Sequence, residues 1–322
     1  MASIPRWARK ILVASVSVFL LALVGGNSYG AWYLAHRTVS PEWDAEETAD
    51  PVLERDLAAL APEDVRIGPE NLRGWYAEGP SDRPGWVLVH GGGANRTSEV
   101  SRARALHEEG HSVVSLELSY TSGAQPFGGG SRESREIASA LEWLAERTGG
   151  RRPLLYGCSL GAFCVLVAVA AGAPAAAVVA DSGFVSVLRA RADQYPVALF
   201  SAMPLLYPLF SGGAELRDLS RSVEGGGLPI PTLIIHGTAD DQIDAGNGPD
   251  LARITGGELW APDGVGHCEA FRARRGEFLE RLGSLAARAS DRSPSVGPAI
   301  RVPQMEQFVP PFRVVARGDL AP

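Results

Sequence analysis

A serine between two glycines is the first candidate for chemistry in this sequence. The pentapeptide GCSLG at residues 157–161 follows an apolar run at 153–156 and leads into an apolar stretch at 160–171. This pattern predicts a strand, a sharp turn and a helix. Such a turn lifts the serine hydroxyl clear of the sheet, and the amino end of the helix faces any developing negative charge. We therefore interpret Ser159 as a nucleophile.

A second match to the G-x-S-x-G pattern is GNSYG at residues 26–30. It lies inside the uncharged segment 11–35, with no predicted strand before it and no turn into a helix after it. The pattern alone is a weak signal, because this chain contains 37 glycines. We interpret the second match as small residues in or near a membrane helix.

A serine nucleophile needs a base to take its proton and an acid to orient that base. His267 lies between the last predicted strand and the final predicted helix, and Asp240 follows another predicted strand. The carboxyl ends of parallel strands meet at one edge of a sheet. The order along the chain therefore predicts a triad of Ser159, Asp240 and His267. Asp241 and Asp181 are the alternatives for the acid.

The other five histidines suit the role of base less well. His36 flanks the apolar N-terminal segment, and His107 and His111 lie at the amino end of a predicted strand, which is the wrong edge of the sheet. His90 and His236 are the last residues of predicted strands, and we expect them to pack beneath the loops that follow.

A glycine-rich turn, HGGG at residues 90–93, follows an apolar strand predicted at 86–90. A backbone N–H can approach an oxyanion only where no Cβ intervenes, so this turn suits an anion. We predict an oxyanion hole made by the N–H groups of Gly92 and Leu160, with Gly93 as the alternative to Gly92.

The sequence HEEGH at residues 107–111 matches the zinc-peptidase pattern in form. That chemistry needs both histidines on one face of an unbroken helix. Gly110 should end the helix, so we predict a solvated helix end, no metal and no cofactor. A zinc peptidase using His107 and His111 is kept as an alternative hypothesis, as is a non-catalytic binding domain.

The chain has three cysteines, too few for a disulfide framework. Two of them adjoin the predicted triad. Cys158 precedes the serine and Cys268 follows the histidine. We expect two buried thiols, with a disulfide between them as the alternative.

The charge composition excludes several functions. The net charge of −7 provides no basic surface for nucleic acid. Lys10 is the only lysine, so the folded region cannot supply a Walker A lysine, a Schiff-base lysine or a lysine general base.

Strands and helices alternate through the middle of the chain. The predicted strands are 65–67 and 72–77, which form a hairpin, then 86–90, 112–118, 153–156, 175–180, 231–236 and 258–261, and the predicted helices are 97–109, 131–147, 160–171 and 267–286. Strands separated by helices pair in parallel. We predict an α/β fold, with a mostly parallel central sheet and helices on both faces, preceded by one transmembrane helix.

The N-terminal segment 11–35 has no charge and, as a helix of about 37 Å, is long enough to cross a bilayer. Basic residues precede it, which favours a cytoplasmic N-terminus and an extracytoplasmic domain. We predict a single-pass cell-membrane anchor, or a secreted protein if this segment is a cleaved signal.

We divide the chain into a basic tail (1–10), the anchor or signal (11–35), a linker (36–62), one domain (63–286) and a Pro-rich tail (287–322). Within the domain, residues 184–228 combine aromatic residues with prolines. This composition is compatible with a small lid over an apolar pocket and with a helix that covers the sheet. The sequence indicates no particular oligomeric state.

Together these motifs resemble the α/β-hydrolase superfamily. The resemblance spans residues 65–285 and depends on VLVHGG at 87–92, GCSLG at 157–161, IHGTAD at 235–240 and GH at 266–267. It implies a serine esterase that transfers the acyl group of a small substrate to water, with a serine peptidase or a thioesterase as alternatives. The apolar N-terminus makes the chain similar to membrane-anchored bacterial and Bem46-like hydrolases. Where many relatives have D-x-R-G-x-G, this chain has ELSYTSG at 117–123, so the resemblance implies no particular substrate.

Overall fold

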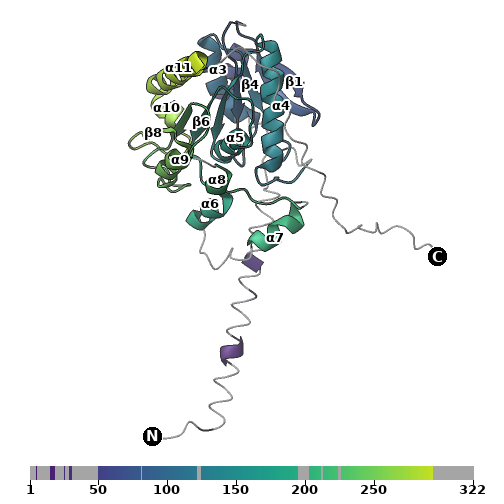
Figure 1. Cartoon of the computed structure of the whole chain (residues 1–322), viewed down its shortest axis with the longest axis vertical. Helices are drawn as coiled ribbons and strands as arrows, with labels where there is room; N and C mark the ends of the chain where they lie inside the picture. The colour runs from purple at the N-terminus through teal and green to yellow at the C-terminus, as the bar shows by residue number, and fades with distance from the viewer. Residues whose placement is uncertain are drawn as a thin grey trace, which may run out of the picture.

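A central sheet of eight strands, in the order β1-β2-β4-β3-β5-β6-β7-β8, runs through the computed structural model (Figure 1). The structure describes residues 50–292, apart from 81, 122–124, 195–202, 212 and 224–225, together with residues 5, 15–18, 25, 29 and 30. β2 pairs antiparallel with both β1 and β4, and all other neighbours pair in parallel. The predicted class, a mostly parallel sheet with helices, is confirmed.

The strands from β3 to β7 are short and mostly apolar. The eight strands are β1 (Glu63–Ile67), β2 (Leu72–Ala77), β3 (Trp86–Val89), β4 (Val113–Leu116), β5 (Leu154–Cys158), β6 (Ala177–Asp181), β7 (Thr232–Ile235) and β8 (Glu258–Trp260). Every residue from β3 to β7 within these bounds is buried. Burial on both faces explains why these strands are continuous apolar runs and show no polar alternation.

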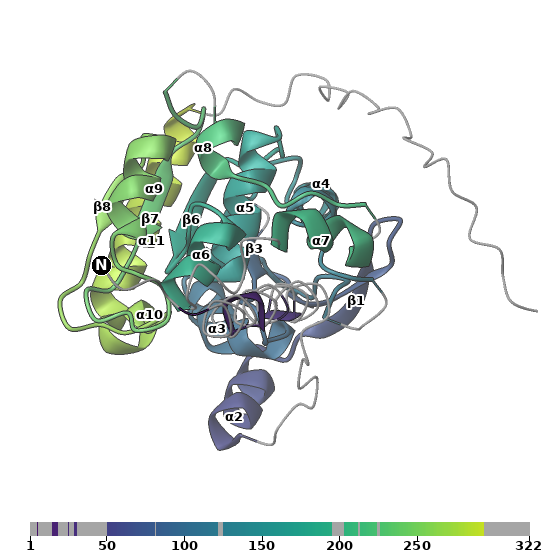
Figure 2. The same cartoon turned by 90° about the horizontal axis from the view of Figure 1, so that it is seen from below.

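Helices cover both faces of the sheet (Figures 1 and 2). The helices of the described residues are α2 (Pro51–Leu60), the 3₁₀ helix η1 (Arg96–Glu99), α3 (Val100–Glu108), α4 (Ser131–Arg147), α5 (Leu160–Ala170), α6 (Val187–Gln194), α7 (Met203–Phe210), α8 (Leu219–Ser222), α9 (Asn247–Thr255), α10 (Ala270–Ala273) and α11 (Arg275–Arg292). The single helix predicted at 267–286 is wrong in its first part: the structure divides it into α10 and α11, and α11 continues six residues beyond the predicted end.

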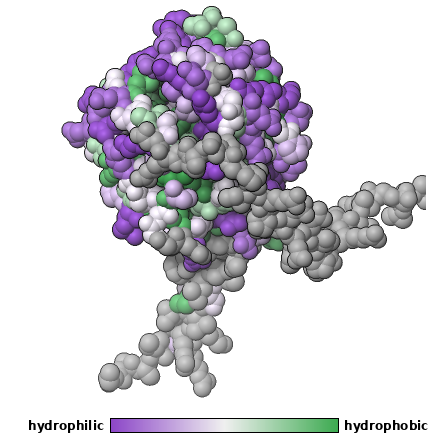
Figure 3. Space-filling view, turned by 45° about the horizontal axis from the view of Figure 1, so that its top comes forward, coloured by the Kyte–Doolittle hydropathy of each residue, from purple (hydrophilic) through white to green (hydrophobic). Residues whose placement is uncertain are grey.

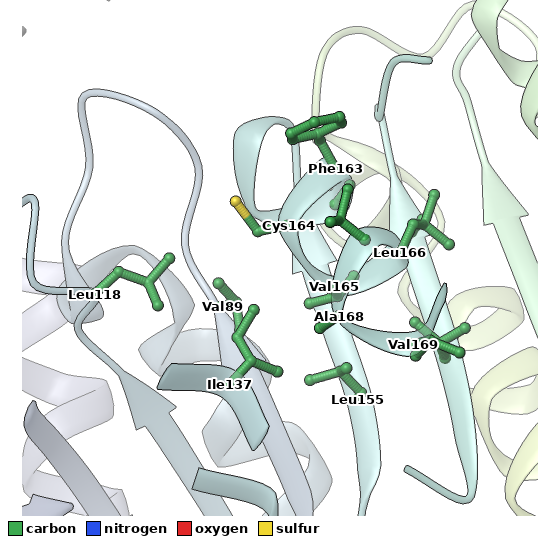
Figure 4. Packing of buried hydrophobic residues seen from close by; sticks show 14 of the residues in the cluster. Val89, Leu118, Ile137, Leu155, Phe163, Cys164, Val165, Leu166, Ala168 and Val169 are labelled. Carbon is green, nitrogen blue, oxygen red and sulfur yellow. The ribbon is translucent and has the colours of Figure 1, made fainter. Parts of the chain in front are cut away.

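Side chains of successive strand residues enter two separate cores. In β3, Val87 and Val89 pack on the side of α4 and α5, whereas Trp86 and Leu88 pack on the side of α3 and α11. Figure 4 shows the first of these cores, where α5 lies against the strands with Val165 and Ala168 beside Leu155. The period-2 geometry of a strand produces this division.

Helix α5 is apolar on all sides, as expected of a helix at the centre of a domain. All its residues from Gly161 to Val169 are buried. Because its packing leaves little freedom, α5 also fixes the turn at its amino end, where Ser159 lies.

The segment predicted as either a lid or a sheet-covering helix forms α6, α7 and α8. In Figures 1 and 2 these helices lie beyond the end of the sheet at which β6 passes into α6, which is the carboxyl end of the parallel strands. Tyr207 of α7 is fully buried, and its hydroxyl donates a hydrogen bond to the carbonyl of Phe127 at 2.6 Å.

The predicted membrane segment 11–35 and the tail 287–322 lie almost entirely outside the described residues. Among the helices that the structure does describe, none combines the length and the apolar character needed to span a membrane. The transmembrane helix therefore stays a prediction. On the face shown in Figure 3, the domain surface is mostly hydrophilic, with smaller hydrophobic areas between.

Candidate active site

Ser159 occupies a sharp turn between β5 and α5, and the strand, turn and helix predicted around it are confirmed. Its backbone has φ 54° and ψ −117°, a conformation that non-glycine residues rarely adopt. Such a conformation costs about 1–3 kcal/mol and persists only where the surroundings impose it. The Ser159 N–H donates to the carbonyl of Asp181 at 2.8 Å, which ties the turn to the end of β6.

The two glycines of the pentapeptide are required by close backbone approach. A Cβ at Gly157 would lie 2.4 Å from the carbonyl oxygen of Gly161. A Cβ at Gly161 would lie 2.4 Å from the carbonyl oxygen of His90. The glycine spacing therefore allows the helix to begin directly against the strands.

His267 and Asp240 form a hydrogen-bonded pair. Nδ1 of His267 lies 2.8 Å from Oδ2 and 3.0 Å from Oδ1 of Asp240, whose side chain is fully buried. Oδ1 also accepts the backbone N–H groups of Ile243 at 2.9 Å and Gln242 at 3.0 Å. A carboxylate can only accept, so Nδ1 carries the hydrogen and Nε2 is left as an acceptor.

The environment favours the ionised form of Asp240. Burial alone would raise the pKa of this carboxyl, but the hydrogen bonds from His267, Ile243 and Gln242 outweigh burial, and the pKa is lowered. A negative charge is therefore held beside the imidazole of His267.

The two alternative acids occupy other environments. Asp241 is exposed to solvent. Asp181 is buried and accepts the hydroxyl of Tyr156 at 3.0 Å, and burial raises its pKa. Among the described residues, Asp240 is the carboxylate that is hydrogen-bonded to His267.

Cys158 and Cys268 form a disulfide, so the expectation of two buried thiols was wrong and the alternative holds. Their Cα atoms are 6.1 Å apart across 110 residues of sequence. Ser159 directly follows Cys158 and His267 directly precedes Cys268, so the Cα atoms of Ser159 and His267 lie within about 14 Å of each other. No hydrogen bond joins the Ser159 hydroxyl to the imidazole in the described part of the chain. Such contacts are often long without substrate.

The glycine-rich turn after β3 lies against Ser159. A Cβ at Gly91 would be 3.3 Å from the Cβ of Ser159, and the predicted donor Gly92 is exposed. Leu160 is the first residue of α5, so its N–H has no partner within the helix. Gly93 has φ 74°, which glycine adopts without strain.

His90 holds this turn in place, because both of its ring nitrogens are hydrogen-bonded to the backbone. Its Nε2 accepts the N–H of Leu118 at 3.3 Å, so the hydrogen is on Nδ1, which donates to the carbonyl of Gly91 at 2.9 Å. Burial lowers the pKa of His90 to about 4, and the ring is therefore neutral at neutral pH. The sequence prediction that His90 packs beneath its loop is confirmed.

The histidines of the HEEGH motif lie in different environments, and the prediction of a solvated helix end is wrong for His111, which is buried. Helix α3 ends at Glu108, and Gly110 follows with φ 86°. Nδ1 of His107 lies 3.1 Å from the carbonyl of His111, whereas Nδ1 of His111 lies 2.9 Å from the carbonyl of Pro84. Within the described ranges, no group of three or more His, Cys, Asp or Glu residues could hold a metal ion.

Three further residues support the site, and sequence reasoning missed their roles. Nε2 of the buried His236 lies 3.4 Å from Oδ2 of Asp240. Ser182 and Arg102 both bind the backbone of Cys268. Only the position of Ser182 directly after a strand end could have drawn attention to it in the sequence.

The comparisons with known proteins agree in fold. No protein-family model matches the chain, and no curated protein matches it by sequence. An esterase from Pyrococcus furiosus, Pf2001, has a similar structure, with a TM-score of 0.59 and 19% identity over 78% of this chain and 98% of that one. A bacterial membrane phospholipase A matches with a TM-score of 0.52 and 20% identity, over 88% of this chain and 99% of the other.

The acylaminoacyl peptidase of Pyrococcus horikoshii matches with a TM-score of 0.52 and 16% identity, over 70% of this chain and 41% of the peptidase. At these identities the similarity shows the fold. The chain has the α/β-hydrolase fold, and the turn at Ser159, the His–Asp pair and the glycine-rich turn lie at the carboxyl edge of its sheet.

Proposed function

We propose that this protein is a serine hydrolase that cleaves an ester-type acyl bond through a covalent acyl-enzyme. The observation that carries the proposal is the hydrogen bond from Nδ1 of His267 to the buried carboxylate of Asp240. It fixes the tautomer that a general base requires, and a disulfide ties the histidine loop to the residue before Ser159.

The proposed reaction has two halves. The Ser159 hydroxyl attacks the substrate carbonyl carbon while Nε2 of His267 takes its proton, and the resulting imidazolium gives that proton to the leaving alcohol. Water then attacks the acyl-serine with the same histidine as base, releasing the carboxylic acid and the free serine. Asp240 stays ionised throughout and stabilises the imidazolium charge.

The oxyanion of each tetrahedral intermediate would be held by backbone N–H groups. We assign these to Leu160 and Gly92, with Gly93 as the alternative to Gly92. Each such donor is typically worth about 3 kcal/mol of barrier. The neutral His90 supports this role because its hydrogen bond to the Gly91 carbonyl holds the turn without adding a charge.

The substrate side of the site is proposed to lie beneath α6, α7 and α8. These helices lie at the carboxyl end of the parallel strands (Figures 1 and 2), the end at which β5 leads into the turn of Ser159. This placement supports a lid role, with an acyl group of short or medium length below the lid. A peptidase or thioesterase on the same residues is the second candidate, because the structurally similar proteins include an acylaminoacyl peptidase.

We also propose that the domain works outside the cytoplasm, anchored by residues 11–35 or secreted after their removal. The disulfide supports this location, since disulfides persist in oxidising compartments. No nucleic-acid partner, metal or cofactor is proposed.

A fluorophosphonate probe tests the function directly. We expect it to label Ser159, identified by peptide mapping, and we expect Ser159→Ala to abolish labelling and to lower turnover of a p-nitrophenyl ester by several orders of magnitude. The loss is on the scale of about 10⁶ seen in another serine hydrolase. Ser28→Ala, in the second G-x-S-x-G match, is the matched control and should keep full activity.

Retention of more than a tenth of the activity by Ser159→Ala would contradict the assignment. Loss of activity on chelation would instead favour the zinc hypothesis of His107 and His111. A panel of ester, thioester and peptide substrates then separates the remaining alternatives.

A further inference from the structure

Cys268, the residue after His267, is held at three of its atoms. Its Sγ is bonded to Cys158, its N–H donates to Oγ of Ser182 at 2.9 Å, and its carbonyl accepts from Nη2 of Arg102 at 2.7 Å. These partners come from three separate elements, namely the ends of β5 and β6 and helix α3. One residue is thereby connected to the residue before Ser159, to the end of the neighbouring strand β6 and to a helix on one face of the sheet.

The backbone of Cys268 would not keep its conformation unaided. Its φ is 55°, in the left-handed region that favours glycine. Strain of this kind persists only when the surrounding structure over-determines it. The three bonds to neighbouring elements provide that constraint.

The partners of Cys268 are themselves fixed. Arg102 is almost buried, its Nη1 lies 3.2 Å from Oε2 of the buried Glu99, and its guanidinium lies over the rings of Tyr156 at 5.3 Å and Phe271 at 5.7 Å. The N–H of the fully buried Ser182 donates to the carbonyl of Ile235 at 2.8 Å. The support for Cys268 is therefore rigid.

His267 has little support of its own. Among the described residues, neither its N–H nor its carbonyl makes a hydrogen bond, and its ring is held through Nδ1 by Asp240. Its position relative to Ser159 therefore depends on Asp240 at the ring and on Cys268 at the next residue of the backbone.

We propose that Cys268 is a positioning residue that sets the place of His267 relative to Ser159, with Cys158, Ser182 and Arg102 as its supports. The inference rests on the proposed function, in which His267 is the base. A disulfide that joins the neighbours of the nucleophile and of the base also makes turnover sensitive to reduction. A dithiol would convert the disulfide to two thiols, transferring two electrons and two protons, and would itself become a disulfide.

The test compares the oxidised and reduced full chain. We expect dithiothreitol to lower kcat for a p-nitrophenyl ester about 10- to 100-fold, since misplacement of a catalytic group by 1 Å can cost about 10². KM should change much less, and reoxidation should restore kcat. Cys164→Ala is the matched control, because Cys164 is a buried free thiol and its removal should leave the redox response unchanged. Circular dichroism verifies that the reduced protein is folded.

Two variants separate positioning from general stability. The double variant Cys158→Ala/Cys268→Ala should show the low kcat without reductant, and the acid limb of its pH–rate profile should move because the contact of His267 with Asp240 is loosened. A purely structural disulfide would lower the melting temperature and leave that limb in place. If the reduced and double-variant proteins unfold, Ser182→Ala is tested in their place. This variant removes only the hydroxyl that accepts the N–H of Cys268. It should lower kcat at least threefold and leave KM unchanged.

The outcomes are distinguishable. Failure of the oxidised wild type to label at Ser159 overturns the proposed function, and this inference with it. Labelling of the oxidised protein, together with a kcat within twofold after reduction of a folded sample, overturns the positioning role of Cys268 alone. Where Ser182→Ala is the variant tested, an unchanged kcat likewise overturns the positioning role of Cys268.

Discussion

Replacing Asp240 with asparagine should disable the site by changing the tautomer of His267. In the structure, Oδ1 of Asp240 accepts two backbone N–H groups, and Oδ2 lies 2.8 Å from Nδ1 of His267. An asparagine would keep its one oxygen on the backbone donors and turn its NH₂ group toward Nδ1. Two donors cannot face each other, so the ring hydrogen moves to Nε2, the nitrogen that accepts the serine proton in the proposed reaction.

The rate loss follows from this exchange. The same substitution in another Ser-His-Asp enzyme leaves the geometry intact and lowers kcat by about 10⁴, and we expect the same order here. Such a loss corresponds to about 5 kcal/mol of barrier. Loss of the charge-assisted hydrogen bond should also destabilise the fold by about 1.5–3 kcal/mol, since the Asp240 side chain is fully buried.

The stability difference between wild type and Asp240→Asn should depend on pH in a defined direction. The pKa of Asp240 is lowered from its ordinary value of 3.8, with the raising effect of burial outweighed by its hydrogen bonds. The stabilisation is therefore complete well above 3.8 and is lost as the pH falls through the lowered pKa. Urea unfolding at neutral and at acid pH should show the difference shrinking.

The assay is kcat with a p-nitrophenyl ester, corrected for the folded fraction. Asp241→Asn is the matched control and should retain activity within about twofold, because this exposed side chain is typical of surface positions that tolerate substitution. Asp181→Asn should lower stability more than it lowers the rate per folded molecule. If Asp240→Asn kept more than a hundredth of kcat, or if Asp241→Asn lost as much as Asp240→Asn, the assignment of the acid would be refuted.

Two further predictions concern packing and buried charge. Gly161→Ala should destabilise the domain by about 3 kcal/mol or more, because the new Cβ would lie 2.4 Å from the carbonyl oxygen of His90. A Cβ at Gly283 in α11 would meet nothing within 4 Å, so Gly283→Ala should be neutral or slightly stabilising. Thermal unfolding of both variants measures this contrast. Burial raises the pKa of Glu133 from 4.5 to about 7. As the pH rises, the unfolded chain therefore loses this proton before the folded protein does. The free energy of unfolding should fall by about 3 kcal/mol between the two pKa values. Urea unfolding at each end of the window, repeated with Glu133→Leu, should show the decrease in the wild type and a smaller one in the variant.

The features that local patterns specify were predicted well. The hairpin of β1 and β2, the parallel strands and the turn at Ser159 depend on apolar runs and on glycines a few residues apart, and all are observed. The pairing of Asp240 with His267 could also be predicted, because parallel strands bring their carboxyl ends to one edge whatever the intervening sequence.

The features that depend on distant residues were not predicted. Cys158 and Cys268 are separated by 110 residues, and no local signal distinguishes their disulfide from two thiols. Arg102 lies on an ordinary-looking helix, and its bond to the Cys268 carbonyl spans 166 residues of sequence. Tertiary packing alone gives these side chains a role, which is why composition and periodicity are silent on them.

Backbone strain gives an independent reason to place the chemistry at this edge. Among the described residues, five that are not glycine have positive φ, and three of them, Ser159, Ser182 and Cys268, are joined by bonds at the site. Strain in this region costs about 1–3 kcal/mol per residue, a large amount beside the stability of a typical domain. A fold maintains it only where other bonds compensate, and here the compensating bonds converge on the residue beside His267. The strained backbone therefore belongs to one connected unit, and the chemistry proposed for Ser159 requires that unit to keep its base in place.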